Sequence, residues 1–80
     1  MKNKNKYIEI FTKSLSIGKK KFKESIKYND IPEWDSIGHM TLMSDLEDGF
    51  KISIDTDDVI DFSSFKKGME ILSKKHNINF

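Results

Sequence analysis

The stretch from Trp34 to Phe50, with the sequence WDSIGHMTLMSDLEDGF, constrains the fold of this chain more than any other part. Its larger side chains recur every three or four residues, the spacing that gathers them on one face of an α-helix. The residues on that face are His39, Leu42, Met43, Leu46 and Phe50. We predict that the helix packs this face into a hydrophobic core.

The opposite face of the predicted helix is more polar. It carries Ile37, Met40, Thr41, Ser44 and Asp48. Ile37 and Met40 are apolar and lie near the start of the helix, where the same core cannot also take them. We expect both side chains to be exposed and to contact another molecule, although single exposed apolar side chains are common.

Ser36 stands at the start of this helix. We predict that it is the N-cap, because serine is among the best acceptors for the N–H groups of a first helical turn. Pro32 and Asp35 suit the turn that leads into it. A phosphate bound to the Ser36 hydroxyl would be stabilised by the unpaired N–H groups and the positive end of the helix dipole. Ser36 is therefore a candidate for modification rather than for catalysis.

The first part of the chain predicts one helix and a long link. The apolar spacing from Tyr7 to Leu15 predicts a helix over about residues 4–16, with Gly18 as its stop. The link that follows is longer than most interhelical connections. Apolar residues that can pin it to the core through a short helical turn are Phe22, Ile26 and Tyr28. The lysine run at 19–21 is either a solvated surface or a contact for anionic partners.

Beyond Phe50 the chain predicts two more helices. Thr56 can cap a short helix over residues 57–61, whose apolar contacts would come from Val59, Ile60 and Phe62. Ser63 or Ser64 can cap a final helix over about residues 65–75, with inward residues Phe65, Met69 and Leu72. The predicted fold class is all-α, a small four-helix bundle with three main helices, one short helix and a long first loop.

Length and composition indicate one small domain over residues 1–80, with ends at 1–6 and 77–80 that we expect to be flexible. The absence of cysteine excludes disulfides and thiolate metal sites. The segment DTDDVID lacks the glycine and the final glutamate of a calcium loop, so we predict no metal site. Without a membrane-length apolar run or a signal peptide, we expect a cytoplasmic location.

Charge divides the chain into two unlike parts. Residues 1–30 hold nine lysines against three acidic residues, whereas residues 31–80 hold five lysines against ten acidic residues. An acidic surface around Ser36 would attract basic patches on partner proteins. The scattered lysines do not resemble a nucleic-acid site, in which basic residues share one element with groups that stack on bases or read them.

Asp35-Ser36-Ile37 resembles the Asp-Ser-Leu signature of the acyl carrier proteins. The similarity spans about Tyr7 to Lys75, nearly the whole chain, with no insertion after Ser36. Further matching positions are Leu42, Leu46-Glu47, Phe50, Ile54, Asp57-Asp58 and the apolar residues from Phe65 to Leu72.

This resemblance implies that Ser36 carries 4′-phosphopantetheine, moved from coenzyme A by a phosphopantetheinyl transferase that recognises Asp35. The protein would not be an enzyme. As a monomer it would carry acyl or aminoacyl groups as thioesters and deliver them, through transient contacts, to enzymes of fatty-acid or specialised biosynthesis. The form Trp-Asp-Ser-Ile-Gly-His and the basic first half are more similar to carriers of specialised pathways than to the housekeeping fatty-acid carrier.

The resemblance also implies two sets of site residues. The partner-binding set comprises Asp35, Ile37, Met40, Thr41, Ser44, Glu47 and Asp48. The side chains that would line a cavity for the carried acyl group are Met43, Leu46 and Phe50.

Other interpretations stay open. The main alternative is a non-enzymatic helical protein-interaction module in which Ser36 is only an N-cap. Nucleic-acid binding is a third hypothesis, against which the acidic half of the chain counts. We reject a nucleophile pair of Ser36 and His39, because no acid orients the imidazole and no oxyanion site accompanies it. We expect His39 to pack partly in the core, while Trp34 could either stack on a ligand or close the end of the bundle.

Overall fold

The computed structural model describes residues 2–80 and, for Lys2, the backbone alone. It contains four α-helices: α1, Lys2–Ser14; α2, Ser36–Phe50; α3, Thr56–Asp61; and α4, Phe65–His76. Within the described residues no strand forms, and one isolated antiparallel bridge joins Lys27 to Ser64. The predicted all-α bundle of three main helices, one short helix and a long first loop is confirmed.

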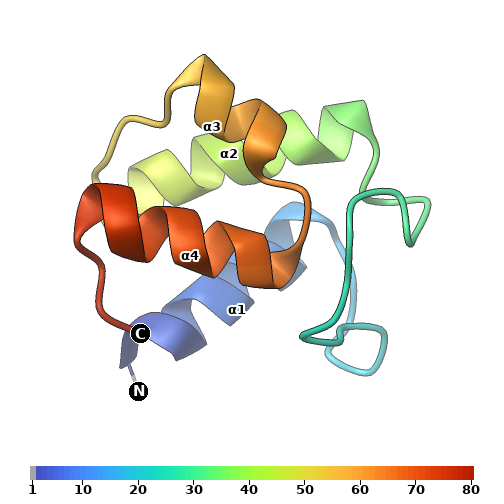
Figure 1. The fold of residues 1–80 in the computed structure, drawn as a ribbon. Coiled ribbons are helices and arrows are strands. Elements are labelled where there is room, and N and C mark those ends of the chain that lie inside the picture. The colour runs from blue at the N-terminus through green and yellow to red at the C-terminus, as the bar shows by residue number, and fades with distance from the viewer. Residues whose placement is uncertain (1) are drawn as a thin grey trace.

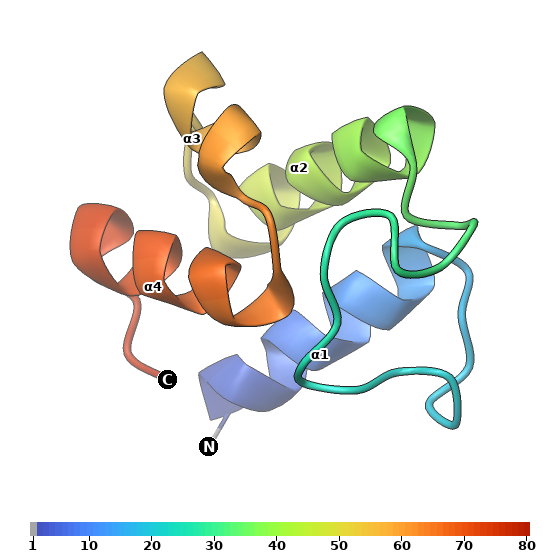
Figure 2. The ribbon, with the colours of Figure 1, turned by 45° about the vertical axis from the view of Figure 1, so that its right-hand side comes forward.

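The helices are arranged in two halves (Figure 1). α2 and α3 lie in the upper half of the view and α1 and α4 in the lower half, while the link between α1 and α2 runs along one flank. Both views place the two ends of the chain next to each other (Figures 1 and 2). There the Asn3 side-chain nitrogen Nδ2 donates to the Asn79 carbonyl oxygen at 2.8 Å.

The described parts of the two ends, residues 2–6 and 77–80, make contacts with the rest of the fold, and their expected flexibility stays a prediction. Residues 2–6 form the first turns of α1, so this helix begins two residues earlier than predicted. Met1 lies outside the described residues. At the other end Ile78 is buried, and the Phe80 ring lies 5.4 Å from the ring of Tyr7. Apolar contacts thus attach the C-terminal tail to the core.

The end of α1 is formed without a glycine. Ser16 adopts the left-handed conformation, with a φ of 54°. The N–H groups of Ser16 and Ile17 donate to the carbonyl oxygens of Lys13 and Thr12, at 3.1 and 3.0 Å. These two bonds make a Schellman motif, which ends the helix. The predicted stop at Gly18 was wrong, because that residue lies beyond the motif and has no positive φ.

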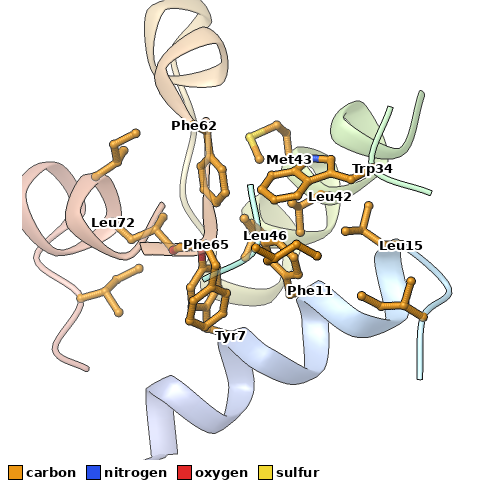
Figure 3. Close-up of a cluster of buried hydrophobic side chains, with 14 residues drawn as sticks. Tyr7, Phe11, Leu15, Trp34, Leu42, Met43, Leu46, Phe62, Phe65 and Leu72 are labelled. Carbon is orange, nitrogen blue, oxygen red and sulfur yellow. Dashed lines mark hydrogen bonds between the residues drawn. The ribbon is translucent and has the colours of Figure 1, made fainter. Parts of the chain in front are cut away.

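An aromatic-rich core fills the space between the helices (Figure 3). Its buried members are Tyr7, Phe11, Leu15, Ile17, Ile26, Trp34, Leu42, Met43, Leu46, Phe62, Phe65, Ile71, Leu72 and Ile78. Tyr7 and Phe65 stack with ring centroids 4.5 Å apart, and the Tyr7 hydroxyl donates to the Phe65 carbonyl oxygen at 2.8 Å. Burial raises the pKa of Tyr7 well above its usual range, which keeps this donor protonated.

Hydrogen bonds and aromatic contacts pin the link between α1 and α2 to the bundle. The Tyr28 N–H donates to the Ser63 carbonyl oxygen at 2.9 Å, and the Phe65 N–H donates to the Ile26 carbonyl oxygen at 3.0 Å. The Phe22 ring packs 5.0 Å from the ring of Phe65. Phe22 and Ile26 therefore hold the link as predicted, but through turns and a short bridge rather than through a helical turn.

The short helix α3 starts and packs differently from the prediction. It begins at Thr56 itself, and Asp55 before it makes no side-chain cap. Ile60, expected to pack inward, is 73% exposed, whereas Asp58 is 1% exposed. Asp58 and Phe62 are four residues apart and face the core together, so Ile60, two residues from each, points to the opposite side.

The final helix, α4, has the predicted start. The Ser64 hydroxyl accepts the N–H of Lys67 at 2.9 Å and so caps the helix. Phe65 and Leu72 are buried as predicted, and Met69 is half-buried against the core. α4 therefore packs the face that its sequence spacing predicts.

Candidate functional site

Asp35, not Ser36, caps α2. Its Oδ1 accepts the N–H of Gly38 at 2.9 Å, and its carbonyl oxygen accepts the N–H of His39 at 2.8 Å. Ser36 is consequently the first residue of the helix, and the predicted cap was wrong by one position. Aspartate and serine are about equally good caps, so the sequence could not rank two adjacent candidates. In the structure the Gly38 N–H lies within hydrogen-bond distance of Asp35 Oδ1, which makes Asp35 the cap.

The Ser36 side chain is exposed at the N-terminal end of α2. Within residues 2–80 its hydroxyl makes no hydrogen bond, since the capping bond belongs to Asp35. The N–H groups of a first helical turn lack partners inside the helix, and the dipole of this 15-residue helix adds positive potential there. The position therefore suits an attached anionic group such as a phosphodiester.

Alanine substitutions at Asp35 and Ser36 should have unequal effects on stability. Asp35→Ala removes the acceptor for the Gly38 N–H and is expected to lower the free energy of unfolding by about 0.5–2 kcal/mol. Ser36→Ala removes no bond and is expected to change that free energy by less than about 0.5 kcal/mol. Urea unfolding followed by tryptophan fluorescence measures both. If Ser36→Ala lowered the free energy of unfolding more than Asp35→Ala, Ser36 rather than Asp35 would be the cap.

Gly38 lets the preceding turn fold against the first turn of α2. A Cβ atom at this position would collide with the Glu33 carbonyl oxygen. The Glu33 carboxylate is itself held by Lys21, whose Nζ donates to both oxygens at 2.7 and 2.8 Å. This hydrogen bond is the main cause that lowers the pKa of Glu33. The placement of Ser36 thus depends on a close backbone approach that a side chain at Gly38 would prevent.

Trp34 and His39 form a buried polar pair behind the candidate serine. Trp34 Nε1–H donates to His39 Nδ1 at 2.9 Å, and His39 Nε2 lies 2.7 Å from the Val59 carbonyl oxygen. Because an indole can only donate, Nδ1 accepts and Nε2 carries the proton of a neutral imidazole. With both nitrogens engaged, His39 cannot serve Ser36 as a base. Trp34 is fully buried and belongs to the core, so it is not a surface on which a ligand could stack.

Large apolar side chains are exposed on α2 and α3. Ile37 is 77% exposed and Met40 is 59% exposed, as their face of the helix predicts. Thr41 and Ser44 on the same face are also exposed, and the Thr41 hydroxyl donates to the Ile37 carbonyl oxygen at 3.1 Å. Ile60 on α3 is also exposed. Its exposure was missed, because it follows from the inward orientation of its neighbours rather than from its own residue type.

Several acidic residues near the site are engaged within the fold. Asp45 Oδ2 accepts the Ser14 hydroxyl at 2.6 Å, and Glu47 Oε2 accepts the Ile54 N–H at 2.7 Å. Glu47, predicted to bind partners, thus also has a structural hydrogen bond, and its partner-binding role stays a prediction. The acidic residues of α2, α3 and the intervening turn that are exposed are Asp48, Asp55, Asp57 and Asp61. Asp48 keeps the exposure that a partner-binding role requires.

The predicted role of Met43, Leu46 and Phe50 in lining an acyl cavity stays a prediction. Met43 and Leu46 are buried in the core (Figure 3), and the Phe50 ring lies 6.5 Å from the ring of Phe80 with Lys6 Nζ 5.0 Å from its centroid. An apolar cavity of about 240 Å³ lies where α3 meets α2 and the link. Its lining residues are Tyr28, His39, Val59, Ile60, Phe62 and Ser63.

No family model, no curated protein and no solved structure matches this chain. In the part of the chain that the structure describes, no helix combines the length and apolar character that a membrane crossing requires. Nor do three His, Asp or Glu side chains gather there closely enough to hold a metal ion. The residues around Ser36 are therefore the basis on which a function can be inferred.

Proposed function

We propose that this protein is an acyl carrier whose Ser36 hydroxyl bears 4′-phosphopantetheine. The observation that supports this most directly is the exposed hydroxyl at the first position of α2, with the capping bond made by Asp35 instead. Capping by Asp35 leaves the Ser36 hydroxyl without a structural role and removes the explanation of this serine as a simple N-cap. The Asp35-Ser36-Ile37 motif adds support from the sequence.

Loading would join Ser36 Oγ to the phosphorus of coenzyme A that carries the pantetheine. The phosphoanhydride bond breaks, adenosine 3′,5′-bisphosphate leaves, and the hydroxyl proton passes to a base of the transferase. The first turn of α2 would stabilise the new phosphodiester through its N–H groups and its dipole. When bound, the group supplies a terminal thiol, which this cysteine-free chain lacks.

The transferase and the acyl- or aminoacyl-processing enzymes would contact the exposed apolar side chains of α2 and α3, which are Ile37, Met40 and Ile60. These apolar side chains lie on the two helices that also present exposed acidic residues, so basic partner surfaces would fit. Met40 suits contacts with several partners, because its side chain is flexible and polarisable. The contacts would be small, since a carrier must dissociate after each step. The apolar cavity beside α3 could shelter the carried group.

Intact-mass spectrometry tests the proposal. After incubation with coenzyme A, Mg²⁺ and a phosphopantetheinyl transferase of broad specificity, we expect the wild-type protein to gain the mass of one phosphopantetheinyl group. Ser36→Ala should gain nothing. Ser73→Ala changes an exposed serine on α4, away from the proposed site, and should load like the wild type.

Failure of the folded wild-type protein to load with several transferases would overturn the proposal, and so would loading of Ser36→Ala. In either case the exposed Ile37, Met40 and Ile60 would favour a helical protein-interaction module without catalytic activity. Chemical cross-linking to partners, compared between the wild type and a variant with serine at these three positions, would then be the next measurement.

A further inference from the structure

The short helix α3 has few stabilising interactions within itself. It spans six residues, Thr56–Asp61, and Asp55 before it makes no side-chain cap. A helix of this length is not stable by itself, so its position depends on contacts with the rest of the protein. Polar contacts to α2 and to α4 supply part of that support.

The contact with α2 is the hydrogen bond between His39 Nε2 and the Val59 carbonyl oxygen. The contact with α4 is an ion pair, in which Lys75 Nζ lies 2.5 Å from Asp58 Oδ1. Asp58 is almost completely buried, whereas Lys75 reaches it from the last turn of α4 and stays half exposed. The hydrogen bond and the charge of Asp58 raise the pKa of Lys75, so the lysine is held in its charged form.

α3 and the two residues that follow it form one wall of the apolar cavity of about 240 Å³. The residues on that wall are Val59, Ile60, Phe62 and Ser63. The opposite wall consists of Tyr28 and His39, and the buried Trp34 ring packs against both, with centroids 6.0 and 6.1 Å away. The opposite wall is therefore anchored in the core, and movement of α3 would change the width of the cavity.

We propose that the Asp58–Lys75 ion pair holds α3 in its position beside this cavity and so limits the size of the apolar ligand that the cavity admits. Without the lysine, the Asp58 carboxylate would be buried without a countercharge, which is strongly unfavourable. Outward movement of α3 would return the carboxylate to water. Asp61 and Asp55 also raise the pKa of Lys75, so removal of the lysine charge would leave three neighbouring carboxylates without it. The proposal concerns the cavity itself and does not depend on modification of Ser36.

Variants can separate this role from a general loss of stability. Lys75→Met keeps most of the length of the side chain and removes its charge. Asp58→Leu combined with Lys75→Met replaces the ion pair with apolar side chains, an exchange that proteins often tolerate. Lys74→Met is the matched control, because Lys74 pairs with Glu70 on the surface of the same helix turn.

Hydrogen exchange and binding of Nile red, an uncharged apolar fluorophore, are measured on each variant. In Lys75→Met we expect the Val59 and Phe62 amides, which donate to carbonyl oxygens within α3 and just before it, to exchange at least about tenfold faster. The Leu46 amide in α2 should exchange as in the wild type, and Nile red should bind several-fold more tightly. The double variant and Lys74→Met should behave like the wild type in both measurements.

Unchanged exchange at Val59 and Phe62 in Lys75→Met would overturn the proposal. Equal acceleration in α2 would also overturn it, because this would reveal a general loss of stability. If Lys75→Met does not fold, Asp58→Asn provides a second test, since it removes the charge from the buried member of the pair while preserving its shape. We then expect a smaller acceleration confined to α3, and its absence would contradict the proposed role of the pair.

Discussion

Replacement of Trp34 with alanine is expected to lower the free energy of unfolding by about 3–5 kcal/mol. The indole is completely buried and packs edge-on against Phe11, with ring centroids 4.9 Å apart. Its removal creates a cavity and also takes the hydrogen bond from His39 Nδ1. Because a domain has only about 5–15 kcal/mol of stability in total, this loss should leave a substantial unfolded population. Ser36, two residues further on, should lose its fixed position with it.

Trp34→Phe separates the packing loss from the hydrogen-bond loss. Phenylalanine fills most of the volume but has no N–H, so His39 Nδ1 is left without its donor, at a cost of about 1–3 kcal/mol. Trp34 is the only tryptophan, so urea unfolding of both variants must be followed by far-ultraviolet circular dichroism rather than by fluorescence. A Trp34→Ala variant as stable as the wild type would show that the indole is not packed as described.

Gly68→Ala is expected to destabilise the protein by about 1–3 kcal/mol, even though alanine is the better helix former. A Cβ atom at Gly68 would collide with the Phe62 ring and the Tyr7 hydroxyl. Neither group can move away freely, since both side chains are buried and the hydroxyl is bonded to the Phe65 carbonyl oxygen. Gly68 is thus needed for α4 to pack over the residues that join it to α1 and α3.

Gly18→Ala is the matched control for this effect. No atom lies within 4 Å of the Cβ position at Gly18, and its φ is not positive. Loss of backbone freedom in the unfolded chain should make this variant as stable as the wild type or up to about 1 kcal/mol more stable. Urea unfolding compares the two variants directly. If both substitutions changed the stability equally, the packing around Gly68 could not be the cause of the loss.

The helices and their buried faces could be predicted from the sequence, because local patterns determine them. α4 was predicted over residues 65–75 and extends over Phe65–His76. Leu42 and Leu46, one turn apart, identify the buried face of α2 whatever lies opposite them. The same periodicity correctly placed Ile37 and Met40 on the exposed face beside Ser36.

Adjacent residues of similar capping strength were harder to resolve. Asp35 and Ser36 could each cap α2, and in the structure the Gly38 N–H bonds to Asp35, where the preceding turn packs closely against Gly38. Glu47 was predicted only to bind partners, and the sequence did not reveal that its carboxylate accepts the Ile54 N–H after the chain has turned back. In both cases the side chain bonds to a backbone N–H group, and residue types alone do not predict where that group lies.

By itself, the sequence determined the number and type of helices, the buried faces of α2 and α4, and the exposure of Ile37 and Met40 beside Ser36. Only the tertiary structure decided that Asp58 is buried, that Ile60 is exposed, and that the apolar cavity lies beside α3. The physical reason is that periodicity acts over a few neighbouring residues. A buried charge needs a partner such as Lys75, seventeen residues away, and a cavity exists only where segments brought together by folding fail to fill the space between them.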